Sequence, residues 1–169
     1  MSDDGFTEMT IYRLVLDPNT NSPIVILQDK ATNAMLPIWI GIFEAHAIAM
    51  KLEGVESARP MTHDLLKNTF GAINALVERV EVVDLVDNTY FARIQFILGD
   101  KRHAIDSRPS DAIALALRAA CPIFVANHVL ESSKIDPAGF ALEAGDDENE
   151  DEWTRILKNY KPGSNDKAN

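Results

Sequence analysis

The chain of 169 residues contains a single cysteine, Cys121. One thiol cannot form a disulfide within the chain, so a disulfide-stabilised secreted fold is excluded. The first residues, Met-Ser-Asp-Asp-Gly, lack the basic and apolar regions of a signal peptide, and we expect a cytoplasmic protein. No uncharged apolar run reaches the roughly 18 residues of a membrane span. Arg118 and Asn127 interrupt the best candidate, so we expect no membrane partner.

Basic residues are also scarce, because the formal net charge is -10. Residues 143–152 hold seven acids and no base, and residues 1–142 still carry 12 Lys and Arg against 18 Asp and Glu. Phosphate contacts draw on Lys and Arg, so this balance argues against a nucleic-acid binder that works by a broad basic surface. A local positive cleft, or a metal ion held by the acids, stays open.

Compact catalytic motifs are missing as well. The sequence has no His-Glu-x-x-His, no paired cysteines, no P-loop and no Gly-x-Ser-x-Gly. Any active site must therefore be assembled from residues that are distant in sequence.

What the chain does have is enough apolar sequence, 46%, for one domain with a real core. Alternating apolar residues and turn formers predict strands over 7–17, 24–27 and 35–40, followed by a helix over 41–52. Thr62 is a good N-cap for a second helix over 63–79. Further strands are predicted over 80–86, 90–98 and 103–105, then a helix from Pro109 and a last strand over 123–130.

The order of three strands and a helix thus occurs twice. Superposing the two helices places Ile40 on Ile105 and Ala47 on Ala112, which indicates an internal duplication, although an Ala-rich match of this length also arises by chance. We predict an α+β fold with a mostly antiparallel sheet, a duplicated three-strand-plus-helix unit and an additional central helix. We assign it to residues 1–135, and residues 136–169 to an acidic, largely flexible tail in which a short helix could form over 153–160.

The turn before the later helix concentrates polar residues. Pro109 suits the first helical position, and Asp111 on its own is more typical of a helix-start acid than of a catalyst. Asp106 and Arg108 are not needed to start the helix, and both flank an anion-binding helix terminus. The segment therefore combines a buried helix start with two candidate functional residues.

Acids recur at the other two helix starts, as Glu44 and Asp64, and the second of these follows Arg59-Pro60 and His63. If the three starts converge, carboxylates could hold a divalent ion, arginine could steady a phosphate and His63 could transfer a proton. The pattern therefore favours phosphoryl chemistry.

Three blocks, Leu36–Ala49, Arg59–Leu66 and Ile105–Leu117, together resemble the bifunctional nuclease domain family, long catalogued as a domain of unknown function. The resemblance covers roughly residues 7–130. It implies a nuclease that hydrolyses phosphodiester bonds of both RNA and DNA with low base specificity. The alternative is a non-catalytic, oligomeric binding or scaffold module, which the net charge and the missing motifs favour.

Placing the blocks on this sequence gives the candidate site. We expect catalytic roles for His63, Asp64, Asp106 and Arg108, substrate binding by Arg59, Arg108 and Ser110, and a Mg²⁺ or Mn²⁺ ion, if one assists, on Glu44, Asp106 and Asp111. The helices over 45–52 and 112–117 have almost no polar face, so we also expect a homo-oligomer, at least a dimer, to cover them.

Overall fold

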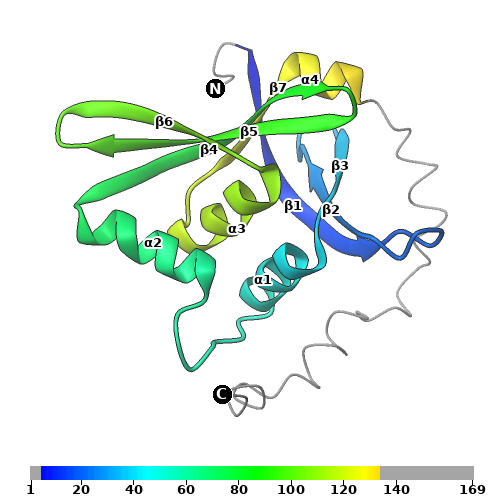
Figure 1. Ribbon diagram of the computed structural model, residues 1–169. Coiled ribbons are helices and arrows are strands. Elements are labelled where there is room, and N and C mark those ends of the chain that lie inside the picture. Colours follow the sequence, from blue (N-terminus) through cyan, green and yellow to red (C-terminus); the bar gives the residue numbers. More distant parts are fainter. Residues whose placement is uncertain (1–4, 134–169) are drawn as a thin grey trace.

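The computed structural model describes residues 5–133, which form one seven-stranded sheet with four helices (Figure 1). The sheet order is β3-β2-β1-β7-β4-β5-β6, and every neighbouring pair is antiparallel except β4 and β7. The elements are β1 (Phe6–Leu16), β2 (Pro23–Gln28), β3 (Met35–Trp39), α1 (Ile42–Leu52), α2 (Thr62–Ala72), β4 (Ala75–Val86), β5 (Thr89–Leu98), β6 (Lys101–Ser107), α3 (Pro109–Ala119), β7 (Ile123–Ala126) and α4 (Asn127–Ser132). The predicted α+β class and mostly antiparallel sheet are confirmed. The proposed tail and its short helix lie outside the described residues.

The duplicated unit is visible in the strand order. The meander β1-β2-β3 with α1 lies on one side of β7, and the meander β4-β5-β6 with α3 lies on the other. Helix α2 is the addition between the two units. Aligning the helices by their first residues, Ile42 and Pro109, makes Glu44 and Asp111 equivalent, which corrects the superposition of Ala47 on Ala112.

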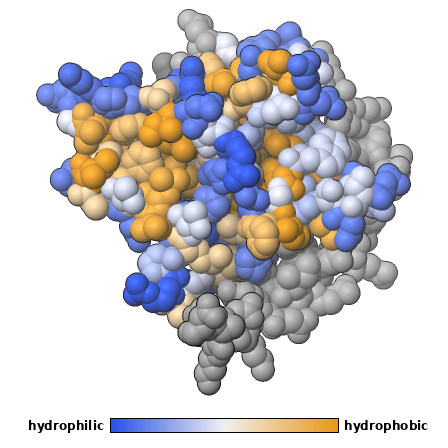
Figure 2. Space-filling view, viewed as in Figure 1, coloured by the Kyte–Doolittle hydropathy of each residue, from blue (hydrophilic) through white to orange (hydrophobic). Residues whose placement is uncertain are grey.

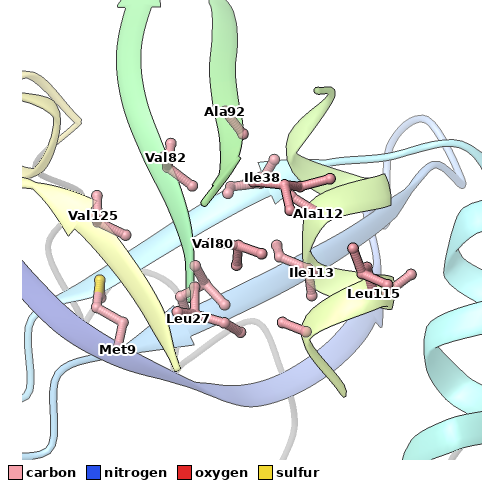
Figure 3. Close-up of a cluster of buried hydrophobic side chains, with 14 of the residues drawn as sticks. Met9, Leu27, Ile38, Val80, Val82, Ala92, Ala112, Ile113, Leu115 and Val125 are labelled. Carbon is pink, nitrogen blue, oxygen red and sulfur yellow. The ribbon is translucent and has the colours of Figure 1, made fainter. Parts of the chain in front are cut away.

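Helix α3 lies at the centre of the core. Its residues from Ala112 to Ala116 are at most 1% exposed, and it contacts α1, α2, β4 and β5 (Figure 3). A helix that is apolar on most of its surface needs cover on several sides, and here one chain supplies it. This helix therefore gives no reason to expect a partner subunit, and the homo-oligomer stays a prediction. No helix within residues 5–133 has the length and apolar character to cross a membrane.

The second helix is shorter than predicted. It ends at Ala72, and Asn74 adopts a left-handed φ of 56° that starts the turn into β4. Leu76 and Val77, which fitted a helical stripe, instead pair with Ile97 and Phe96 of β5. The apolar spacing around these two residues fits both a helix and a strand, and the pairing with β5 makes the segment a strand.

The last strand is also shorter than predicted. It ends at Ala126, and residues up to Leu130 lie in α4 rather than in the sheet. The strand ends there because its partner β1 begins at Phe6, so β7 pairs with β1 only from Phe6 to Met9. At the next residue, where α4 begins, the N–H of Asn127 donates a hydrogen bond to the carbonyl oxygen of Gly5.

A buried arginine joins the three central helices. The Arg118 side chain is 6% exposed, and its Nε donates to Oδ1 of Asp64 at 2.6 Å. Its other two nitrogens donate to the carbonyl oxygens of Ala114 and Ala47 at 2.9 and 3.0 Å. Asp64 also accepts the N–H of Met61, the N-cap of α2, at 2.9 Å. Arg118 therefore fixes the start of α2 against α1 and α3.

On the other face of the sheet, the carboxylate of Glu81 is buried. It accepts hydrogen bonds from Arg93 and Gln95, and Nε of Arg79 lies 2.7 Å from its Oε1. Burial opposes ionisation of Glu81, but the hydrogen bonds from Arg93 and Gln95 and the charges of Arg93 and Arg79 together outweigh burial and lower its pKa. The guanidinium of Arg79 also lies 5.1 Å from the ring centroid of Phe124.

We expect Glu81→Gln to lower the free energy of unfolding by about 2 kcal/mol at pH 7, because the arginines lose a charged acceptor. A depressed folded-state pKa gives stability that is complete above the ordinary value of 4.5 and is lost as pH falls through the folded value. The deficit of the variant should therefore shrink below about pH 4 in urea unfolding. A deficit independent of pH would contradict this account of Glu81.

Candidate active site

The first turns of three helices meet around Arg108, the residue that precedes α3. Glu44 is the third residue of α1, His63 the second of α2 and Asp111 the third of α3. Acids are common in first turns because they face the positive helix end. Pro109 at the first position of α3 keeps Arg108 in an extended conformation, with φ -67° and ψ 145°. The predicted chemistry required the three helix starts to converge, and the structure does bring Glu44, His63 and Asp111 together around Arg108.

Four of these side chains form a continuous series, here called the Arg108 cluster. Arg108 Nε donates to Asp111 Oδ2 at 2.7 Å, and Arg108 Nη2 donates to Glu44 Oε1 at 2.8 Å. The other oxygen of Asp111, Oδ1, lies 2.9 Å from His63 Nε2. The Arg108 side chain is 65% exposed, whereas those of Glu44 and His63 are 17% and 9% exposed. Arg108 is therefore the most exposed member of the cluster.

The contacts between Asp111 and Arg108 stabilise the charged forms of both side chains. Burial opposes ionisation of Asp111, but hydrogen bonds from Arg108 and His63 outweigh it and lower the pKa of Asp111. Hydrogen bonds to Asp111 and then Glu44 raise the pKa of Arg108 further. The cluster therefore presents a permanently protonated guanidinium whose orientation is set by two carboxylates.

A cleft of about 420 Å³ opens beside Arg108. The cleft is lined by Ser22, the end of β3 with the two residues after it, the turn before β5 with the start of β5, and the start of α3 with the residue before it. The lining residues are Ser22, Ile38, Trp39, Ile40, Gly41, Asn88, Thr89, Tyr90, Arg108, Pro109 and Ser110. Trp39 is 48% exposed there, and its Nε1 donates to Oδ2 of Asp17 at 3.0 Å. We call this the Arg108 cleft. One cation, aromatic rings and hydroxyl groups suit a ligand with both an anionic and a planar part.

Gly41, the N-cap of α1, makes the contact between Glu44 and Arg108 sterically feasible. A Cβ atom at Gly41 would lie 2.2 Å from Glu44 Oε2, because this carboxylate folds back over the helix start. Sequence reasoning identified Gly41 only as a helix start, and it missed Trp39 and Tyr90. The sequence signal for Gly41 was its position three residues before Glu44, whose carboxylate folds back over the start of the helix.

The remaining predicted site residues lie elsewhere or serve other contacts. Asp64 binds Arg118 and the N-cap of α2, which gives it a structural role. Arg59 is exposed in the loop between α1 and α2 and does not line the cleft. Ser110, 6% exposed, does line it. Asp106 pairs in register with Arg93, whose side chain binds Glu81 on the sheet face opposite the helices, so the structure separates Asp106 from the Arg108 cluster.

The predicted metal ligands do not form one set. Glu44 and Asp111 both bind the guanidinium of Arg108, and Asp106 lies on the other face of the sheet. Within residues 5–133 there is no group of three or more His, Cys, Asp or Glu side chains that could hold a metal ion. The donor arrangement therefore does not fit a divalent ion.

Cys121 offers no alternative nucleophile. Burial raises the pKa of its thiol to about 11, which leaves almost no thiolate at neutral pH.

Comparison with known proteins places this architecture in a family. The profile of the bifunctional nuclease domain matches residues 25–138. An uncharacterized protein of Mycobacterium tuberculosis is 34% identical over 151 residues, covering 89% of this chain and 85% of that protein. Two Arabidopsis thaliana proteins named bifunctional nuclease 2 and bifunctional nuclease 1 are 30% and 29% identical, each over 66% of this chain.

The chain spans only 35% and 38% of the length of those two plant proteins. The matched segment includes every member of the Arg108 cluster and every residue that lines the Arg108 cleft except Ser22. This chain belongs to the bifunctional nuclease domain family.

Proposed function

We propose that the protein is a nuclease that hydrolyses phosphodiester bonds of RNA and DNA with low base specificity, and that the Arg108 cleft is its active site. The observation that carries this proposal is the exposed Arg108 guanidinium, held by two carboxylates at the wall of a cleft large enough for a nucleotide. The family membership and the names of the plant relatives, bifunctional nuclease 1 and 2, support it.

Arg108 would bind the phosphate. The two carboxylates occupy Nε and Nη2, so Nη1 is the nitrogen that a phosphate oxygen would meet. Arginine neutralises charge that builds on the phosphate oxygens during attack, and the positive end of α3 adds to this effect. Asp111 and His63 act as positioning residues, because the His63 ring is 9% exposed and its Nε2 faces Asp111.

Glu44 is the best-placed proton acceptor. Its Oε1 binds Arg108, while Oε2 remains over the small Gly41. In the proposed reaction a water oxygen attacks phosphorus, Glu44 accepts the water proton, and the ester P–O bond breaks with the leaving oxygen protonated from solvent. No step is assigned to a metal ion, since the ligands do not form a set.

The cleft favours a flexible single strand. A volume of about 420 Å³ suits one nucleotide unit rather than a duplex, and half-exposed Trp39 offers a ring on which any base can stack. Stacking of this kind is indifferent to base identity, which agrees with low base specificity. The acidic composition agrees with binding by this local site instead of by a wide basic surface.

A non-catalytic binding module is the second candidate. It is favoured by the enclosed His63 and by the lack of a metal-ligand group within residues 5–133. Such a module would bind oligonucleotides at Arg108 without cleaving them. Either function is compatible with a cytoplasmic location, which we propose because the lone Cys121 gives the chain no internal disulfide.

We expect Arg108→Ala to lower cleavage of single-stranded RNA and DNA oligonucleotides about 100-fold, as for loss of one transition-state donor. Arg59→Ala is the matched comparison, because it removes the other exposed arginine that precedes a proline at a helix start. It should retain activity. Initial rates should be measured with purified protein in Mg²⁺, in Mn²⁺ and in EDTA.

Equal cleavage by the wild type and Arg108→Ala would indicate a contaminating nuclease or a different site. Oligonucleotide binding that depends on Arg108 without cleavage in any of the three buffers would favour the binding module. Retention of activity in EDTA would agree with the donor geometry, whereas strict dependence on Mn²⁺ or Mg²⁺ would show that substrate completes a metal site.

Gly41→Ala should displace the Glu44 carboxylate, because the added Cβ would lie 2.2 Å from its Oε2. The carboxylate is a flexible side-chain end, so we expect the free energy of unfolding to change by less than about 1 kcal/mol. If Glu44 accepts the proton, kcat should fall at least tenfold while KM changes little. Gly71→Ala is the control, since a Cβ there meets no atom within 4 Å. Unchanged kcat in Gly41→Ala would remove Glu44 from the reaction.

A further inference from the structure

Within residues 5–133, one edge of the sheet is left without a neighbouring strand or helix over it. Six of the seven residues of β6 are exposed, and the strand pairs with β5 along its whole length without a bulge. It contains neither proline nor glycine. The opposite edge, β3, has five residues, three of them buried, and includes Pro37. Long, flat, exposed edges invite pairing with another strand, and proteins usually shield them.

Apolar groups accompany this edge. Ile105 is 46% exposed and Leu98 39% exposed, and both belong to the β5–β6 hairpin. The ring of His103 stacks on Phe96 with centroids 5.1 Å apart. Figure 2 shows hydrophobic surface gathered on the side of the molecule where Figure 1 places this hairpin and α2. An uncovered apolar patch beside an unpaired edge indicates an interaction surface.

We propose that two copies of this chain pair through β6, antiparallel and centred on Ala104, so that their sheets join into one. In this register all seven residues of β6 are paired. Arg102 of each copy lies opposite Asp106 of the partner subunit. The register with β5 places Arg102 and Asp106 on the same face of β6, so the opposite charges meet twice across the two-fold axis.

Neighbouring registers lack this complementarity. Centring the pair on His103 would set Arg102 opposite Ala104, and centring it on Ile105 would set Asp106 opposite Ala104. Each leaves charges without a partner across the interface and shortens the paired segment. In the Ala104 register the opposite face sets Ile105 against His103, so the exposed apolar groups cover each other. The charges and the apolar groups therefore select the same register.

This interface gives Asp106 a role that the Arg108 cluster does not. Asp106 is not needed to start α3, and it lies on the sheet face away from the cleft. Arg102, whose side chain is 75% exposed, already binds Glu78 Oε1 at 2.8 Å. That exposed contact leaves other guanidinium nitrogens for Asp106 of the partner subunit.

The test is a reciprocal charge exchange on the full-length protein, with mass measured by sedimentation equilibrium. The wild type should be a dimer at micromolar concentration. Arg102→Asp and Asp106→Arg each oppose like charges twice, so each should raise the dimer dissociation constant at least tenfold. The double variant should return it toward the wild-type value. An equimolar mixture of the two single variants should form mixed dimers, because each Asp then meets an Arg.

Lys30→Asp, in the turn between β2 and β3, is the charge-matched control and should remain dimeric. Circular dichroism checks that each variant is folded. Concentration-dependent hydrogen-exchange protection should appear in β6 and not in β3. A monomeric wild type, single variants that dimerise like the wild type, or a mixture that stays monomeric would each overturn the proposal. None of these readouts uses nuclease activity, so the outcome is independent of the proposed reaction.

Discussion

Burial of α3 on several sides is the constraint on which the rest of the structure depends. Its middle residues, at most 1% exposed, fill the space between the sheet and the two other central helices. A helix in this position can carry polar groups only at its ends. Arg108 and Asp111 lie at its start, and Arg118 lies in its last turn. The site and the interhelical contact at Arg118 are thus the two ends of one buried helix.

The charges at both ends are paired before any ligand arrives. Arg118 meets Asp64 and two backbone carbonyls, which compensates the loss of hydration of a guanidinium that is 6% exposed. Arg108 also has two carboxylates, but its side chain is 65% exposed. The same residue type therefore serves structure where water is excluded and remains available to a ligand where water is present. Exposure, not the number of carboxylates, separates the two roles.

The sequence predicted the class of the fold, the repeated unit and, to within one residue, the start of each central helix, because helix starts and apolar periods are local signals. The predicted N-cap of α2, Thr62, is instead the first helical residue, and Met61 is the N-cap. It did not predict that Leu76 and Val77 belong to a strand, since their pattern fits both periods and only pairing with β5 decides. For the site, first-turn acids and the Arg-Pro turn were visible locally. Whether Asp106 joins them depends on which way a strand residue points. Asp106 directly precedes Ser107, and this offset of one position is enough to place it on the other face.

The duplication explains why the cluster is asymmetric. Glu44 and Asp111 occupy equivalent positions in the two units, and both reach the same guanidinium. The equivalent N-cap positions differ, because one holds Arg108 and the other holds Gly41. A second arginine at Gly41 would place two cations between the same two acids, and any side chain there would meet Glu44 Oε2. Gly41 in one unit therefore allows Glu44 of that unit to share Arg108 with Asp111 of the other unit. Two nearly equivalent helix starts thus produce a single oriented guanidinium.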